Sequence, residues 1–148
     1  MKRPAPSDLR LPPCEGPLPD VDRPLTREYW KGTRRHELLA QQCSDCGRVR
    51  WLPKPMCPRC NSFAATWVST GTTGTVFSFI ISYRGFGAYW EKRVPYVVAL
   101  VEMDDEPSVR LMTDLVGCEP NEVHVGMPVS VVFDDVTEEV TLPRFGPV

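Results

Sequence analysis

The stretch "CSDCGRVRWLPKPMCPRC", residues 43–60, contains two Cys-x-x-Cys pairs separated by ten residues. A tight turn between paired cysteines directs both sulfur atoms to one side, and two such turns together supply four thiolates for a tetrahedral metal ion. Gly47 follows the first pair and Asn61 follows the second, and both residue types tolerate the positive φ that these turns need. The pattern therefore predicts a zinc ribbon with the ligands Cys43, Cys46, Cys57 and Cys60.

Other uses of the four cysteines remain open at this point. A redox dithiol usually has a single pair beside a βαβ unit, whereas this chain has two pairs and no such pattern. Iron in a rubredoxin-like site would use the same four thiolates as zinc. A catalytic zinc keeps one coordination position for water or substrate, and four thiolates would close that position. We therefore expect a structural ion.

The remaining candidate nucleophiles and bases are scattered along the chain. Cys14 and Cys118 stand apart from the paired cysteines, and we expect both to be free thiols. His36 and His124 are the only histidines, and neither Cys14 nor Cys118 has a histidine close enough in sequence to suggest a nucleophile pair. No nucleophile, base and oxyanion site are recognisable together. The sequence therefore predicts no catalytic residues, and we expect the chain to be non-catalytic on its own.

Composition restricts the class of protein. The 148 residues are 42% hydrophobic and 24% charged, with a net charge of −2, which is ordinary for a soluble protein of one domain or two small ones. The apolar runs are too short to span a bilayer, and the basic start of the chain lacks the apolar segment of a secretory signal. We expect a cytoplasmic protein, in which clustered cysteines bind metal more often than they form disulfides.

The first part of the chain divides into a tail and a helical segment. Seven of the 16 prolines lie within residues 1–24, which predicts an extended, proline-rich tail. The next segment, "LTREYWKGTRR", predicts a short helix that Thr26 caps and that Gly32 ends or weakens. Tyr29 and Trp30 would face a core. We group this helix with the ribbon as a unit over residues 25–66.

Beyond Cys60 the chain becomes rich in Val, Ile, Thr and aromatic residues, in runs separated by Gly, Pro and Asp. About five short strands favour a small barrel of the OB type, because closure removes exposed sheet edges. The expected strands lie within residues 66–84, 96–104, 108–116, 128–136 and 139–145. The predicted fold class is mainly β, with the OB-fold barrel and a C-terminal arm over residues 67–148.

The order of these segments resembles the DUF35 family. The resemblance rests on "REYWKG", the cysteine-containing segment, "GTVFSF", "PYVVALVEMD" and "VGMPVSVVFDDVTEEVTLPRF", and it covers about residues 25–145. It implies an N-terminal helical segment, a rubredoxin-like zinc ribbon with a structural Zn²⁺, and a C-terminal OB-fold. The four zinc ligands of the family correspond to the four paired cysteines of this chain.

The resemblance also implies a function that residue spacing does not show. Proteins of this family are auxiliary subunits of acyl-CoA enzymes, and they pair with thiolase-fold partners such as thiolases or lipid-transfer-protein-like aldolases. Some assemble with hot-dog-fold enoyl-CoA hydratases in steroid or lipid side-chain degradation. The implied assembly is a heteromeric complex, a heterotetramer, in which a CoA thioester is bound at a site shared with the partner.

The loop at residues 82–96 is the strongest candidate for contact with CoA or with the partner. Its aromatic residues would complete the barrel core, or they would face a ligand or partner, because Tyr, Trp and Arg dominate interface hot spots. Its cations would then lie near the CoA phosphates. The candidate residues are Arg84, Phe86, Tyr89, Trp90, Lys92 and Arg93.

A single-stranded nucleic-acid-binding protein is the competing hypothesis. Zinc ribbons and OB-folds often bind nucleic acid, the OB-fold through aromatic residues in a basic groove. The ribbon segment "GRVRWLPKP" is both basic and aromatic. The negative net charge and the acidic clusters at residues 102–106 and 134–139, which we expect to be solvated turns, make nucleic acid the weaker hypothesis.

Overall fold

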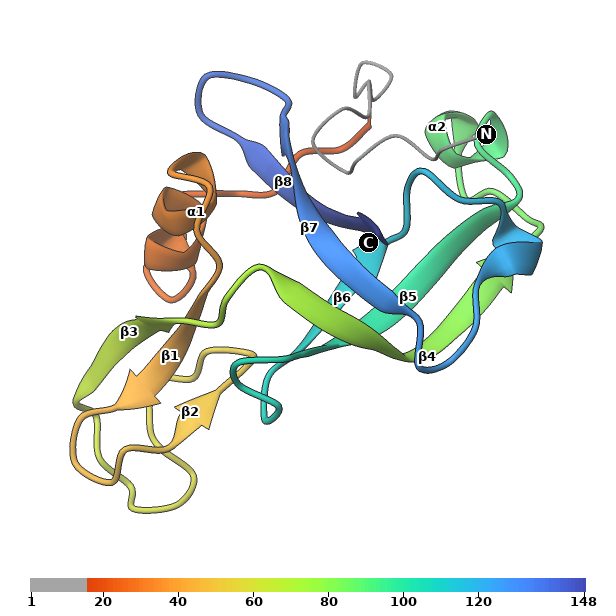
Figure 1. The fold of residues 1–148 in the computed structure, drawn as a ribbon. Helices are drawn as coiled ribbons and strands as arrows, with labels where there is room; N and C mark the ends of the chain where they lie inside the picture. Colours follow the sequence, from red (N-terminus) through yellow and green to blue (C-terminus); the bar gives the residue numbers. More distant parts are fainter. Residues whose placement is uncertain (1–15) are drawn as a thin grey trace.

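The computed structural model describes residues 16–148 as a mainly β chain with a small three-stranded sheet and a larger five-stranded sheet (Figure 1). The predicted fold class is confirmed. Most of the proline-rich tail, including Cys14, lies outside the described residues. The elements are α1 Arg27–Arg34, β1 Leu39–Cys43, β2 Val49–Arg50, β3 Ala65–Ser69, β4 Thr73–Ser82, α2 Ala88–Glu91, β5 Tyr96–Met103, β6 Arg110–Asp114, the 3-10 helix η2 Pro120–Glu122, β7 Pro128–Asp135 and β8 Thr141–Pro147.

The three-stranded sheet belongs to the ribbon and has the antiparallel order β2-β1-β3. Gln41 of β1 pairs with Arg50 of β2. The first cysteine pair begins at Cys43, the last residue of β1, and Cys46 lies in the turn between these strands. Strand β3 pairs with the whole of β1 and spans residues 66 and 67, where we placed the boundary between the ribbon unit and the barrel. Gly71, with a φ of 78°, lies in the turn that leads from β3 into the barrel.

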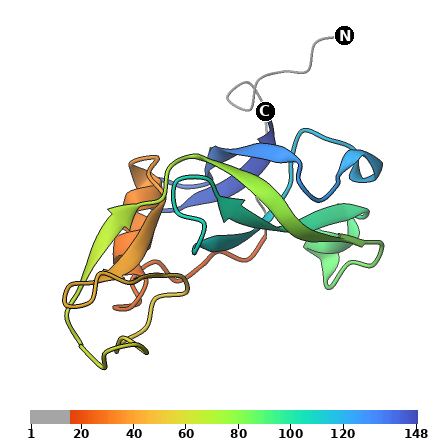
Figure 2. The ribbon, with the colours of Figure 1, turned by 60° about the horizontal axis from the view of Figure 1, so that its bottom comes forward.

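The five-stranded sheet has the antiparallel order β6-β5-β4-β7-β8 and curls into a nearly closed barrel (Figure 2). A bulge between Val76 and Ser78 bends β4, so that one part of this strand pairs with β5 and its first residues also pair with β7. A parallel bridge between Leu115 and Phe145 joins the end of β6 to β8. The OB-type barrel predicted from the sequence is therefore confirmed.

The ribbon, the helix α1 and the barrel share one hydrophobic core. Along β5 each second residue is buried, which gives the barrel its inner face. The same buried cluster includes Tyr29 of α1, Leu38 and Ala40 of the ribbon, and Val101 and Phe145 of the barrel. Because residues of all three parts pack together, unfolding of the ribbon should lower the stability of the barrel.

Helix α1 differs from the sequence-based expectation at both ends. Thr26 occupies the N-cap position, but its side chain makes no capping hydrogen bond. Gly32 lies inside the helix, and a Cβ there would come within 2.8 Å of the Leu39 side chain, so this glycine permits close packing. His36, with a φ of 59°, follows the helix and donates its N–H to the Thr33 carbonyl at 2.9 Å.

The C-terminal residues form the last strand of the barrel, which we expected within residues 139–145 and which continues to Pro147. Residues 141–147 make up β8, which pairs with β7 from Asp135↔Thr141 to Val129↔Pro147. Phe145 is fully buried in the core, which holds this strand in the barrel.

None of the helices within residues 16–148 has the length and apolar character needed to cross a bilayer.

Candidate metal centre and aromatic groove

The two cysteine turns have the same backbone geometry. Gly47 donates its N–H to the Cys43 carbonyl at 2.9 Å, and Asn61 donates its N–H to the Cys57 carbonyl at 2.9 Å. Gly47 has a φ of 73° and Asn61 a φ of 61°, as their residue types predicted. Each turn reverses the direction of the chain, and the sulfur atoms of both turns face a common centre.

The distances between the sulfur atoms fit a tetrahedral zinc ion. The Sγ atoms of Cys43 and Cys60 are 3.6 Å apart, those of Cys46 and Cys57 are 3.7 Å apart, and all four lie within 4.8 Å of one another. Bonds of about 2.3 Å from zinc to sulfur would separate the sulfur atoms of a tetrahedron by about 3.8 Å. A disulfide requires about 2.05 Å between its sulfur atoms, so the four thiols suit a metal.

The local electrostatics favour a bound cation. The backbone N–H of Cys46 donates to the Cys43 sulfur and is the main reason that the pKa of the Cys43 thiol falls to about 6. At Cys60 the N–H of Ser62 acts to lower the pKa, but burial and the neighbouring sulfur atoms raise the pKa to about 12. Four adjacent thiolates repel one another, and a divalent cation removes that repulsion.

The protein supplies all four ligands of the metal ion. Cys43 and Cys57 are buried, Cys46 is half-buried, and Cys60 lies at the surface. With four thiolate ligands, a tetrahedral zinc has no position left for water or substrate. The site therefore fits a structural zinc whose role is to hold the ribbon together.

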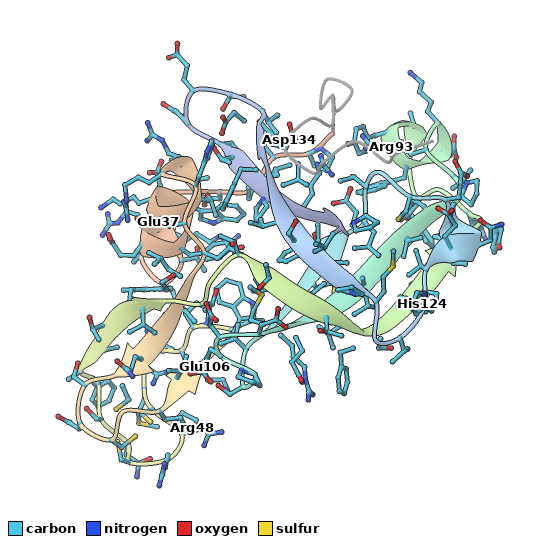
Figure 3. All side chains as sticks on the ribbon, viewed as in Figure 1. Glu37, Arg48, Arg93, Glu106, His124 and Asp134 are labelled. Carbon is cyan, nitrogen blue, oxygen red and sulfur yellow. The ribbon has the colours of Figure 1, made fainter. Side chains whose placement is uncertain are left out.

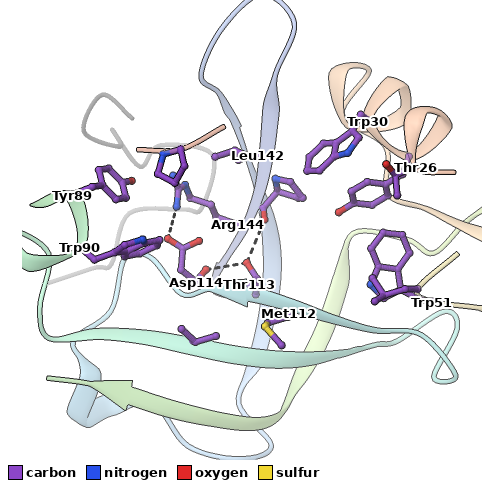
Figure 4. Close-up of a pocket in the computed structure, with 15 residues that line it drawn as sticks. Thr26, Trp30, Trp51, Tyr89, Trp90, Met112, Thr113, Asp114, Leu142 and Arg144 are labelled. Carbon is purple, nitrogen blue, oxygen red and sulfur yellow. Dashed lines mark hydrogen bonds and ion pairs between the residues drawn. The ribbon is translucent and has the colours of Figure 1, made fainter. Parts of the chain in front are cut away.

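A second feature is an apolar cavity of about 460 Å³ at the junction of the helix, the ribbon and the barrel (Figure 4). Helix α1 contributes Tyr29 and Trp30, the ribbon contributes Trp51, and the loop between β4 and β5 contributes Tyr89 and Trp90. We call this cavity the aromatic groove. The aromatic residues were visible in the sequence, but their convergence was not, because they come from three distant segments.

The floor of the aromatic groove contains a buried ion-pair network. Arg144 of β8, whose side chain is 5% exposed, pairs with Asp114 and donates from Nε to Asp134 at 2.8 Å. Burial alone would lower the pKa of the Arg144 guanidinium, but the two carboxylates raise this pKa above its ordinary value. Asp134 was expected in a solvated turn. It instead lies on β7, where the buried arginine requires a counter-ion.

The structure brings together only part of the predicted 82–96 loop site. Tyr89 and Trp90 line the aromatic groove, and the Arg93 guanidinium lies 4.9 Å from the centre of the Tyr89 ring and donates to its hydroxyl. No aromatic side chain of this loop belongs to the buried core cluster of residues 16–148, so these rings do not complete the barrel core. The other three candidates are exposed: Arg84, Phe86 and Lys92.

The outer face of the barrel beside the groove carries exposed apolar side chains. Phe77 is 44% exposed, Ile80 is 63% exposed and Met112 is 77% exposed. The strand register places Ile80 beside Val98 and Met112 beside Leu100 across β4, β5 and β6, and the Arg110 guanidinium lies 3.6 Å from the centre of the Phe77 ring. We call Phe77, Ile80 and Met112 the outer apolar patch.

Comparison with known proteins identifies the family. The model of the ChsH2 rubredoxin-like zinc ribbon domain matches residues 30–64, and the model of the ChsH2 C-terminal OB-fold domain matches residues 67–134. A solved structure, the Ltp2-ChsH2(DUF35) aldolase, contains a chain with 34% identity and a TM-score of 0.77, and the match covers 87% of this chain and 98% of that one. The chain belongs to the DUF35 family.

Two longer proteins are also similar to this DUF35 chain. A probable enoyl-CoA hydratase alpha subunit of Thermomonospora curvata is 36% identical over 132 residues, which cover 88% of this chain. The 3-oxo-4,17-pregnadiene-20-carboxyl-CoA hydratase alpha subunit of Mycobacterium tuberculosis is 34% identical over 110 residues, which cover 74% of this chain. The DUF35 chain spans only 40% and 34% of the lengths of these two relatives.

Proposed function

We propose that this DUF35 chain is a zinc-binding accessory subunit of a complex that processes acyl-CoA thioesters, with a thiolase-fold aldolase or thiolase as its partner. The match to the Ltp2-ChsH2(DUF35) aldolase carries the proposal, because it extends over almost the whole length of both chains. In this arrangement the partner holds the catalytic groups. The zinc ribbon and the barrel, which share one hydrophobic core, dock on the partner and shape the entrance to its active site.

The outer apolar patch supports an assembly with another protein. An exposed cluster of large apolar side chains beside a cavity is typical of surfaces that bind a partner. Phe77, Ile80 and Met112 would become buried when the partner covers this face of β4, β5 and β6. A heterotetramer, with two copies of each chain, is the assembly that we propose.

A hot-dog-fold enoyl-CoA hydratase is the second candidate partner. The two curated relatives favour it, because both are named as alpha subunits of CoA-thioester hydratases. In either complex the chain would act beside a CoA thioester. The name of the Mycobacterium tuberculosis relative includes a pregnadiene carboxylate, and we propose a large apolar acyl group for the complex of this chain as well.

The 82–96 loop is the part of the chain that we assign to the CoA end of the shared site. Arg84 and Lys92 are exposed and available to the phosphates. Replacing both with alanine should raise the KM of the assembled complex for its thioester at least about tenfold, since each hydrogen bond to a charged group contributes about 1.5–3 kcal/mol. Arg48→Ala is the matched control, because Arg48 lies in the ribbon, away from the loop that contains Arg93 (Figure 3). Equal KM values for the unmodified chain, the double variant and Arg48→Ala would show that the 82–96 loop does not contact CoA.

Affinity purification of the tagged chain from its native cell tests the proposed function. We expect a thiolase-fold enzyme to co-elute in near-equal amount and to be identified by mass spectrometry. A hydratase in its place would select the second candidate. Ribosomal or replication proteins, together with heparin binding that weakens steeply as salt rises, would contradict the proposal and favour a nucleic-acid-binding protein.

A further inference from the structure

We propose that the aromatic groove is a binding site for a proline-rich polypeptide in the polyproline II conformation, and that its occupant is the N-terminal segment of the same chain, residues 1–15. This assignment goes beyond the proposed function and does not depend on it. Three features carry it: the residues that already enter the groove, the hydrogen-bond donors that the groove leaves unused, and the sequence of residues 1–15.

The part of the chain that the structure describes begins at the aromatic groove. Gly16 lies directly against the ring of Tyr89, since a Cβ added to Gly16 would come within 2.8 Å of the Cε1 atom and 2.9 Å of the Cζ atom of that ring. Pro17 follows and is itself one of the residues that line the groove. The groove therefore already contains one proline of the proline-rich tail, and residues 1–15 are joined to the chain at this point.

The groove also contains hydrogen-bond donors without acceptors. Tyr29 is 6% exposed and lines the groove, and its hydroxyl has no hydrogen-bond partner within residues 16–148. Burial raises the pKa of this phenol, so the hydroxyl keeps its proton. The indole N–H groups of Trp30, Trp51 and Trp90 likewise have no acceptor in that part of the chain. An occupant with carbonyl groups would satisfy these donors, whereas a hydrocarbon would leave them unpaired.

A polyproline II segment suits both the rings and the donors of the groove. Its backbone forms no internal hydrogen bonds, so its carbonyl groups are free to accept from side chains. Aromatic-lined grooves are the usual binding sites for such segments, because the pyrrolidine rings pack on the aromatic rings. The conformation is preformed, and docking it therefore costs little conformational entropy.

Residues 1–15 have the composition of such a ligand. Prolines occupy positions 4, 6, 12 and 13, and Leu9 and Leu11 supply larger apolar side chains. Each proline fixes φ near its polyproline II value. The segment carries three cationic side chains and two carboxylates, whereas the ion-pair network on the groove floor has one guanidinium and two carboxylates, so the two net charges are opposite in sign. The covalent link at Gly16 keeps the segment at a high local concentration.

Trypsin cleavage after Arg10 of the zinc-loaded full chain tests the proposal. A protease cuts a segment while it is undocked, so cleavage after Arg10 should be at least about tenfold slower in the full chain than in a free peptide of residues 1–15. Trp90→Ala removes a ring from the groove and should raise the rate in the full chain at least about fivefold. Phe86→Ala is the matched control and should leave the rate unchanged, because Phe86 lies in the same loop, is 75% exposed and does not line the groove.

Tyr29→Phe is a second groove variant, which keeps the buried ring and removes only the hydroxyl. It should speed the cleavage about threefold, the effect of losing one hydrogen bond. Intact-mass spectrometry follows the cleavage, and zinc content together with circular dichroism shows that each variant is folded.

Equal cleavage rates in the full chain and in the free peptide would overturn the proposal and leave the groove to a segment of the partner or to a small ligand. It is also overturned if Tyr29→Phe, or a folded Trp90→Ala chain, is cleaved no faster than the unmodified chain, or if Phe86→Ala has as large an effect as Trp90→Ala. Because the chain is tested alone, these results are independent of the identity of the partner, which the affinity purification determines.

Discussion

Cys57→Ser should greatly weaken zinc binding and unfold the ribbon, and it should also lower the thermal stability of the barrel. Cys57 is fully buried at the metal centre, where a serine hydroxyl is a poor substitute for a thiolate ligand. Structural zinc contributes about 10–16 kcal/mol in small zinc-dependent folds, which is as large as the whole stability of a typical domain, about 5–15 kcal/mol. The shared core, through Leu38 and Ala40, transmits the loss to the barrel.

Metal analysis and thermal denaturation followed by circular dichroism measure this effect. We expect one zinc per unmodified chain, less than one for Cys57→Ser, and a single transition that shifts to lower temperature. Cys118→Ser is the control, because Cys118 lies outside the four-cysteine cluster and its variant should keep its zinc. A metal-free Cys57→Ser chain with an unchanged transition would show that the zinc is not structural.

Arg144→Met should cost about 3–5 kcal/mol of unfolding free energy, which is the usual loss when one partner of a buried ion pair is removed. The side chains of Asp114 and Asp134 are only 20% and 15% exposed, so the variant leaves two carboxylates that are poorly solvated and close together. Methionine fills part of the vacated volume, which leaves charge as the main difference. Urea denaturation at neutral pH gives the free energy directly.

The matched control for this prediction is Arg110→Met on the barrel surface. Arg110 pairs with Glu102 at 2.8 Å, but both side chains are accessible to water, and such pairs contribute about 0–1 kcal/mol. Equal losses of unfolding free energy in the two variants would contradict the proposed role of the network.

The parts of the molecule that the sequence predicted are those that depend on local spacing. Cysteine pairs at fixed intervals determine the ligand set, and the residue types at Gly47 and Asn61 reveal the turns that aim the sulfur atoms. Strand-length runs of β-branched residues revealed the barrel. The run that includes Trp67 illustrates the limit, because alternation of side chains identifies a strand but does not say which sheet the strand joins.

The aromatic groove could not be predicted because it depends on contacts between distant segments. Tyr29, Trp51 and Trp90 are far apart along the chain, and they converge only when helix α1 and the ribbon dock on the barrel. The pairing of Arg144 with Asp114 likewise joins residues 30 positions apart on β8 and β6. The sequence places Arg144 in a predicted strand close to the acidic cluster at residues 134–139, and Asp114 belongs to neither acidic cluster, so the sequence does not specify which carboxylates pair with this arginine.

Turnover of an acyl-CoA thioester by the purified components tests most directly whether this chain serves the active site of another protein. The chain alone, its co-purified partner alone and the two together are assayed at the same thioester concentration. We predict no turnover by the chain alone, weak or no turnover by the partner alone, and full activity when the zinc-loaded chain is restored. Turnover by the isolated chain, or a partner whose activity does not change when the chain is added, would contradict the proposed function.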